Sequence, residues 1–284
     1  MPDNTVLVRR LRGSMAHTKL QDLNLSNAFL FAAALSDPET CRIVLQILLG
    51  KPIGSVAVNA EHSLLFSSDC RSIRLDIYAD DVDGTHYNVE MQGENEGNLP
   101  ERSRFHQAEM DALKLEPGED FCLLEPNYVI FICCFDPFQK GLFRYTFTNR
   151  CQETDMALGD GTCKVFFNTK GRNVADVSHT LVNFLKYVEN STDECADALE
   201  DDAIKCIHTR VKHIKQSRDW RRKYMKFEEL LRKEYKQGRE SGAIDGENRM
   251  HTLISKMLEN GEADKIPMLS DKVFLAEMYR KYNL

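Results

Sequence analysis

Residues 73–92 read IRLDIYADDVDGTHYNVEMQ and carry more structural information than any other stretch of the chain. Apolar and polar residues alternate with a period of two on both sides of residues 81–84, and this period is typical of β-strands. The segment Asp81-Val-Asp-Gly84 places a glycine where a tight turn needs a positive φ. The stretch therefore predicts a β-hairpin with one apolar and one polar face.

The register of this hairpin decides which polar residues meet. If Tyr78 pairs with Asn88, then Asp76 lies opposite Glu90, and directly opposed residues have Cβ atoms about 4.5–5.5 Å apart. Two carboxylates at that distance can share a divalent cation such as Mg²⁺, which prefers oxygen ligands. The alternative is an exposed hairpin whose polar residues simply face solvent, and the spacing alone favours that alternative.

Helical and strand patterns alternate around the hairpin. The spacing of apolar residues in 27–49 predicts two helices separated at residues 36–38, with Ser26 as the first N-cap and Gly50 as the last C-cap. Further expected elements are a helix over 101–115, strands over 128–135, 142–148 and 164–168, and a helix over 176–187. This order predicts a mixed α/β core.

Charge is segregated beyond the core. Residues 187–202 hold seven acidic residues and no Lys or Arg, whereas residues 203–240 hold thirteen basic and five acidic residues. The basic helices could bind phosphate with Trp220 as a stacking surface, but we favour a solvated helix face that pairs with the acids. Glycines 238, 242 and 246 predict a hinge or loosely helical linker before a small tail, 251–284.

Composition excludes several classes. The net charge of −7 argues against a uniformly basic protein that coats nucleic acid. Nine cysteines without a Cys-x-x-Cys pair predict reduced thiols and no zinc site. Residues 1–20 lack the apolar core of a signal peptide, and the longest apolar runs, of eight residues, are too short to cross a bilayer. We therefore expect a cytoplasmic protein.

Several ordered motifs make the chain similar to a known family. The main ones are IRLDIY (73–78), YNVEMQ (87–92), LPERSRF (99–105) and YVIFICCFDPF (128–138). Over residues 22–190 the chain resembles the bacterial Rpn-type recombination-promoting nucleases, which are also described as transposases and belong to the PD-(D/E)XK nuclease superfamily. The resemblance implies a restriction-endonuclease-like core, with a mixed central sheet flanked by helices, and a helical C-terminal extension.

Domain limits follow from these patterns. We expect a flexible N-terminus over 1–21, the nuclease-like core over 22–190, a charged helical extension over 191–240, and a linker with a small helical tail over 241–284.

The resemblance also implies the site residues. Asp76 and Glu90 become the metal-binding acids for Mg²⁺ or Mn²⁺, and the backbone carbonyl of Met91 is a further ligand. Gln92 stands where the superfamily name places lysine, and an amide can orient water but cannot act as a base near neutral pH. Asn27 stands where many members carry an acid, which weakens any second metal site.

The arginines of the 99–105 motif are candidates for phosphate binding. Arg102 and Arg104 could hold the DNA backbone through their fork of donors, or they could form ion pairs with Glu101, Asp111 or Glu109, and we weigh the two interpretations equally. We assign no role to His106, since a lone histidine on a helix is seldom a catalyst.

The resemblance therefore implies a metal-dependent DNA endonuclease of the recombination-promoting or transposase-like kind. Two alternatives stay open: a catalytically weak or inactive DNA-binding protein, and an assembly module that forms homo-oligomers through its C-terminal helices.

Overall fold

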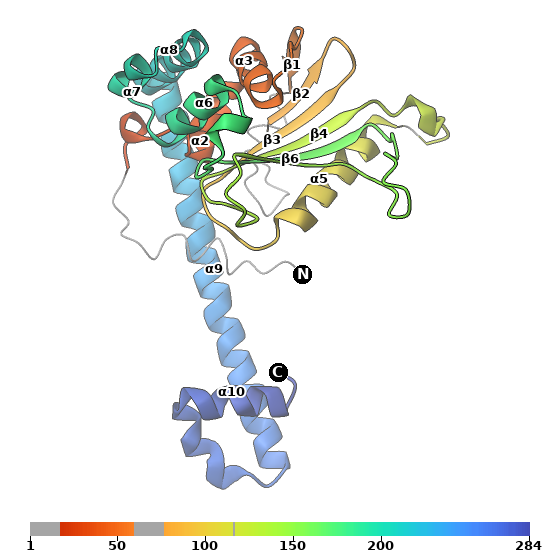
Figure 1. Ribbon diagram of the computed structural model, residues 1–284. Coiled ribbons are helices and arrows are strands. Elements are labelled where there is room, and N and C mark those ends of the chain that lie inside the picture. The colour runs from red at the N-terminus through yellow and green to blue at the C-terminus, as the bar shows by residue number, and fades with distance from the viewer. Residues whose placement is uncertain (1–17, 60–76, 116) are drawn as a thin grey trace. The chain divides into compact units, whose positions relative to one another are not determined.

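A six-stranded mixed sheet forms the centre of the fold. The computed structural model describes residues 18–59, 77–115 and 117–284 (Figure 1). Within these ranges the sheet order is β1-β2-β3-β4-β6-β5, with parallel pairs β3–β4 and β4–β6 and the other pairs antiparallel. The strands are β1 (Val56–Val58), β2 (Ile77–Asp81), β3 (His86–Gln92), β4 (Asn127–Cys133), β5 (Arg144–Phe147) and β6 (Thr162–Asn168).

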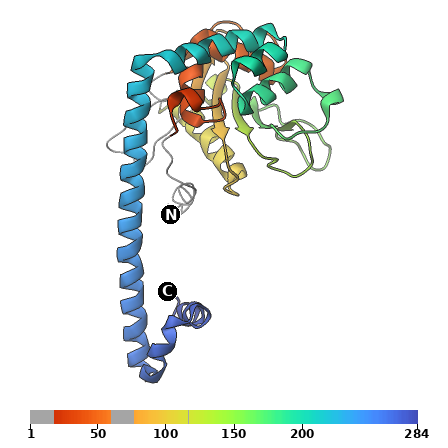
Figure 2. The ribbon, with the colours of Figure 1, turned by 90° about the vertical axis from the view of Figure 1, so that its left-hand side faces the viewer.

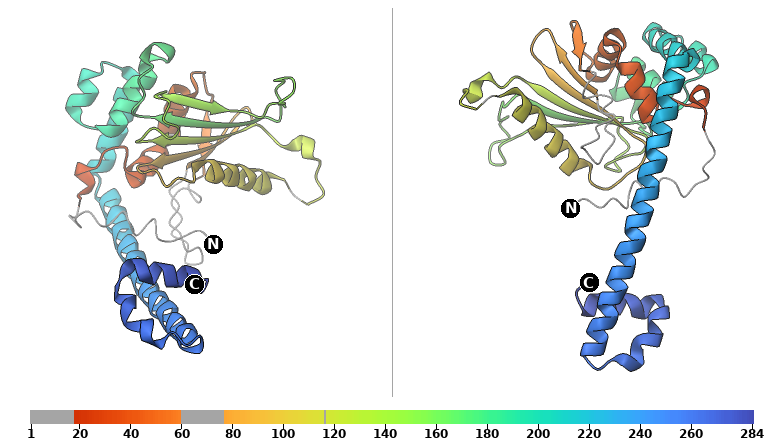
Figure 3. Two further views of the ribbon diagram at one scale, coloured as in Figure 1. Left: turned by 60° about the horizontal axis from the view of Figure 1, so that its bottom comes forward. Right: turned by 180° about the vertical axis from the view of Figure 1, so that it is seen from behind.

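Helices cover the sheet on both faces, as the mixed α/β prediction requires. α5 forms the crossover between the parallel strands β3 and β4 and lies along one face, while α2, α3 and α6 gather at the other (Figures 1 and 3). The α-helices are α2 (Ala28–Leu35), α3 (Pro38–Leu49), α5 (Leu99–Lys114), α6 (His179–Glu189), α7 (Asp193–Ala198), α8 (Asp202–Gln216), α9 (Arg218–Glu259) and α10 (Lys272–Lys281). Short 3₁₀ helices are η1 (Leu20–Asp22), η2 (Phe121–Leu123), η3 (Val174–Asp176) and η4 (Ala263–Ser270).

The predicted hairpin register is confirmed. Tyr78 pairs with Asn88, and Gly84 in the turn has a φ of 80°. The expectation that the polar residues face solvent is wrong for β3, because all seven residues of the strand are buried. β3 lies between β2 and β4, and α5 covers its polar face. Asp76 lies outside the described residues.

The ends of the first two helices are set by short polar side chains and glycine. Asn27, rather than Ser26, is the N-cap of α2, and its Oδ1 accepts hydrogen bonds from the backbone N–H groups of Phe29 and Leu30. Asn27 therefore has a capping role that is independent of any metal. Gly50 caps α3 with a left-handed φ of 67°, as the sequence predicts.

Two boundaries near the site differ from the sequence prediction. α5 begins at Leu99, two residues early, because Pro100 fits the first turn of a helix. β4 ends at Cys133, short of the predicted Phe135, because the Asp136 carboxylate organises the turn that follows. This carboxylate accepts hydrogen bonds from the backbone N–H groups of residues 138, 139 and 141.

The hinge expected at the three glycines is absent, since α9 is helical from Arg218 to Glu259 (Figure 2). Each glycine costs about 1 kcal/mol relative to alanine, but the surrounding Lys, Arg, Glu and Gln are good helix formers. Packing also holds each end of the helix: Trp220 and Tyr224 contact Phe29, while Leu253 and Met257 enter a separate small core. No helix in the described ranges is long and apolar enough to span a membrane.

The described chain divides into two units at Tyr224 and Met225. In the smaller unit, the end of α9 packs with η4 and α10 around Leu253, Met257 and Leu269. Glu262 connects η4 to α10 within this unit, because its carboxylate accepts hydrogen bonds from Lys265, Lys281 and Tyr282 at 2.7–2.8 Å. These bonds lower the pKa of Glu262 from 4.5 to about 2.

A pH dependence of the tail follows from this lowered pKa. A carboxylate with a depressed folded-state pKa stabilises the fold above its ordinary pKa, and the contribution disappears as the pH falls toward about 2. At pH 7 we expect Glu262→Gln to lower hydrogen-exchange protection factors in residues 250–284 by about two- to tenfold. Near pH 2.5 the difference between variant and wild type should shrink. An equal difference at both pH values would contradict this role for Glu262.

Candidate active site on the buried polar face of β3

One face of the central strand β3 is polar although it is buried. Alternate residues of a strand point the same way, so His86, Asn88, Glu90 and Gln92 share this face. All four side chains are buried, with exposed fractions of 0–7%. A helix usually covers a sheet with apolar residues, so a buried row of this kind indicates a function or a bonding network.

Arg102 on α5 joins Glu90 to Gln92. Its Nη2 donates to Glu90 Oε1, and its Nη1 donates to Gln92 Oε1 at 3.1 Å. Its guanidinium carbon lies 5.8 Å from the centre of the Phe131 ring, and Glu96 Oε2 is 3.6 Å from Nη1. Arg102 thus pairs with acids other than the Glu101, Asp111 and Glu109 considered from the sequence. In this arrangement Arg102 neutralises a buried carboxylate.

His106, one helical turn after Arg102, also faces Glu90. Its Nε2 lies 3.6 Å from Glu90 Oε2, and its Nδ1 lies 3.7 Å from Glu109 Oε2. Glu109 in turn accepts a hydrogen bond from the Tyr78 hydroxyl at 3.2 Å. The sequence alone gives no role to His106. The i, i+4 spacing from Arg102 is the signal that could have placed it in the site.

Two of the remaining predicted site residues, Arg104 and Met91, have side chains that lie apart from this group. Arg104 is exposed on α5 and has no ion pair among the described residues. The Met91 side chain is buried on the opposite face of β3, so only its backbone carbonyl is relevant to a metal. Asp76 cannot be placed, because it lies outside the described residues.

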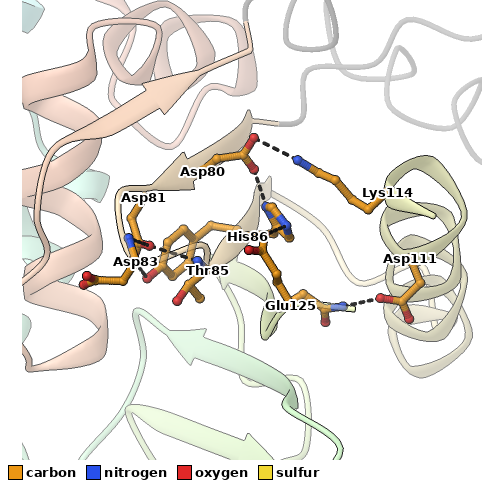
Figure 4. Close-up of polar contacts among 10 residues, drawn as sticks. Asp80, Asp81, Asp83, Thr85, His86, Asp111, Lys114 and Glu125 are labelled. Atoms are coloured by element: carbon orange, nitrogen blue, oxygen red, sulfur yellow. Dashed lines mark hydrogen bonds and ion pairs between the residues drawn. The ribbon is translucent and has the colours of Figure 1, made fainter. Parts of the chain in front are cut away.

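The far end of the same face is a bonding network that holds the hairpin (Figure 4). His86 lies between two carboxylates, with Nδ1 2.5 Å from Asp80 and Nε2 2.9 Å from Glu125. Lys114 on α5 contacts Asp80 at 3.0 Å. Burial raises the pKa of Asp80, but Lys114 and His86 outweigh that effect and leave the pKa below its usual value. These contacts tie β2 and the segment before β4 to α5.

A second chain of buried polar groups continues the network under α5. Lys164 on β6 donates to Gln107, and Gln107 Nε2 donates to Asn127 Oδ1 at 2.5 Å. Asn127 Nδ2 then donates to Asp111 at 2.6 Å, and burial raises the pKa of Asp111. These residues satisfy one another, so the Glu90 end of the face is the better candidate for chemistry.

The stretch of chain that contains this face of β3 matches a known protein family. The sequence pattern of PD-(D/E)XK nuclease family transposases matches residues 51–236, more than half of the chain. The chain belongs to this family. The resemblance drawn from the motifs is thereby confirmed, and the six-stranded sheet flanked by helices agrees with the PD-(D/E)XK fold. Neither a curated protein nor a solved structure matches the chain.

PD-(D/E)XK nucleases generally use divalent metals, and the described part of this site fits one in chemistry. Glu90 is a buried carboxylate, the ligand type that Mg²⁺ prefers. Within the described ranges no three His, Cys, Asp or Glu side chains come together as a metal cluster. Of the two acids predicted as metal ligands, Glu90 is the one that lies in the described part of this family member.

Several side chains of the basic segment of this family member form contacts within the protein. Lys212 and His208 contact Asp193 at 2.6 and 3.0 Å, which supports pairing between the basic and acidic segments. Trp220 packs edge-on against Phe29, and Lys223 lies 4.3 Å above its ring. These contacts favour the solvated helix face over a stacking surface for bases.

Proposed function

We propose that this PD-(D/E)XK family protein is a metal-dependent DNA endonuclease whose site is the Glu90 end of the buried face of β3. The observation that carries the proposal is a buried carboxylate, Glu90, in the second strand of the family hairpin, beside Gln92 and two basic groups of α5. The family supports a nuclease-like or transposase-related activity, and DNA is the substrate that such an activity implies.

Asp76, Glu90 and the Met91 carbonyl would hold Mg²⁺ or Mn²⁺. Such an ion polarises the phosphodiester and lowers the pKa of the attacking water. Gln92 orients water through its amide N–H group, because its Oε1 accepts a hydrogen bond from Arg102. With no lysine at this position, proton removal depends on the metal.

The two arginines divide the binding of phosphate. Arg104 is exposed and can contact the DNA backbone directly. Arg102 is about one quarter exposed and can reach a phosphate only when it gives up its bonds to Glu90 and Gln92. The scissile phosphodiester carries one negative charge and gains a second in the transition state, so it is a suitable exchange partner for a guanidinium.

Arg104→Ala should weaken DNA binding without affecting the fold. Because a backbone contact carries no sequence information, we expect a loss of affinity of about three- to tenfold on all sequences and a salt-dependence slope smaller by about 1. Fluorescence anisotropy with labelled duplexes from 50 to 200 mM salt measures both. Unchanged affinity and slope would remove Arg104 from the interface.

Nicking of supercoiled plasmid tests the proposed function. Wild type and Asp76→Asn are purified in parallel and incubated with Mg²⁺, Mn²⁺ or EDTA. We expect nicking by wild type that requires metal and is lost in the variant. Equal nicking by both proteins would indicate a contaminant or a misplaced site.

A DNA-binding protein without cleavage is the second candidate. Gln92 in place of lysine and the engagement of Glu90 by Arg102 favour it. DNA affinity in anisotropy together with no nicking under any metal would support this candidate.

Source, localisation and self-association are proposed separately from the activity. We propose a bacterial, cytoplasmic protein whose C-terminal helices, residues 191–284, mediate self-association. Light scattering of the full chain and of a chain ending at Glu189 gives the number of subunits in each particle, and an equal number for the two chains would contradict this last point.

A further inference from the structure

Asn88 differs from the other buried asparagines of the protein. In the described ranges, Asn127, Asn168 and Asn183 all have hydrogen-bond partners for their side chains. Asn88 is fully buried, yet neither its Nδ2 nor its Oδ1 has a partner among the residues that the structure describes. A buried amide without partners opposes folding, so its presence calls for a ligand or an ordered water.

The place of Asn88 in the sheet points to the candidate active site. It lies on the central strand β3, between Tyr78 of β2 and Val129 of β4. Glu90 is two residues further along the same face, and one strand repeat of two residues spans about 6.4–6.8 Å. A single water that bonds to both side chains can bridge groups at this spacing.

The chemistry of an amide suits a water molecule better than an ion. Asn88 offers a donor and an acceptor in one side chain, and a buried water typically makes two to four hydrogen bonds to polar groups. The side-chain amide of Gln92 on the same face already has a hydrogen-bond partner, because its Oε1 accepts a hydrogen bond from Arg102.

We propose that Asn88 binds an internal water beside Glu90 and thereby orients the Glu90 carboxylate. Asn88 is a positioning residue in this account, because it acts through Glu90 and does not touch DNA. The proposal rests on the proposed function for its catalytic consequence, whereas the water itself can be observed independently.

Two matched substitutions separate positioning from a structural role. Asn88→Leu keeps the number of side-chain heavy atoms and removes both polar atoms, and Asn127→Leu makes the same change one strand away on the same face. The Asn127 side chain accepts a hydrogen bond from Gln107 and donates one to Asp111, so its replacement removes one hydrogen bond from each of these two partners. We expect the melting temperature of Asn88→Leu to stay within about 3 °C of wild type or rise, and that of Asn127→Leu to fall by about 5 °C or more.

Cleavage kinetics give the second measurement. Asn88→Leu should lower kcat for plasmid nicking by about tenfold with little change in KM, since the DNA contacts are untouched. Asn88→Ser, whose hydroxyl both donates and accepts, should recover activity to within about threefold of wild type. A crystal structure of wild type at high resolution should show a water within hydrogen-bond distance of the Asn88 amide.

The inference is overturned if that crystal structure shows no water at Asn88. It is also overturned if Asn88→Leu melts as low as Asn127→Leu or cleaves at the wild-type rate. If wild type nicks no DNA under any metal, the proposed function fails. In that case the water and the melting temperatures still decide whether Asn88 is a hydration site.

Discussion

Glu90→Gln is expected to reduce metal-dependent DNA cleavage by at least about 100-fold. Loss of even an outer partner of a metal ligand costs 10- to 100-fold, and Glu90 is proposed as the ligand itself. The amide keeps an oxygen that can accept from Arg102, so the packing of α5 should survive. Initial nicking rates on supercoiled plasmid with Mg²⁺ and with Mn²⁺ measure the effect.

Glu96→Gln is the matched control for this substitution. Glu96 also lies near Arg102, at 3.6 Å, but it belongs to the loop after β3 and is not a proposed ligand. We expect its variant to cleave within about threefold of wild type. If Glu90→Gln cleaves as fast as Glu96→Gln, then the site lies elsewhere.

Phe131→Ala is expected to destabilise the larger unit by about 3–5 kcal/mol. Phe131 is fully buried opposite Glu90 in the parallel β3–β4 pair, and its ring stacks on Phe166 with centroids 5.3 Å apart. The truncation opens a cavity under α5. Urea unfolding followed by the fluorescence of Trp220, the single tryptophan, reports on the unit that contains this core.

Leu158→Ala provides the comparison for this unfolding experiment. Leu158 is 67% exposed, so its truncation should change the free energy of unfolding by less than about 0.5 kcal/mol. A cost below about 1 kcal/mol for Phe131→Ala would show that the α5 interface does not depend on this ring.

The hairpin could be predicted because its evidence is local. The period of two, the turn at Gly84 and the pairing of Tyr78 with Asn88 all depend on residues that are close in sequence. The burial of its polar face could not be predicted in the same way. It depends on α5 and β4, which contact β3 only after the chain has folded back.

The partners of the site were the least predictable part. Arg102 and His106 lie 12 and 16 residues after Glu90, and only the direction in which α5 crosses the sheet brings them to its carboxylate. Asn88 looked like any polar strand residue, because its lack of partners is a property of packing. The family motif, by contrast, named Glu90 and Gln92 from sequence alone. Their roles stay predictions, as do Asp76 and the domain limits.

The glycines of α9 show the limit of propensity arguments. Residues 238, 242 and 246 predict a hinge or a loosely helical linker, but helix formation is cooperative and both ends of α9 are held by tertiary contacts. Packing at the ends therefore overrides weak local preference in the middle.

Binding of Mn²⁺ measured by electron paramagnetic resonance tests the central claim, that Glu90 anchors a metal-dependent site, most directly. Titration of wild type, Glu90→Gln and Glu96→Gln records the free Mn²⁺ that remains at each protein concentration. The account predicts binding by wild type and Glu96→Gln and at least about tenfold weaker binding by Glu90→Gln. Equal binding by all three proteins, or no binding by wild type, would contradict it.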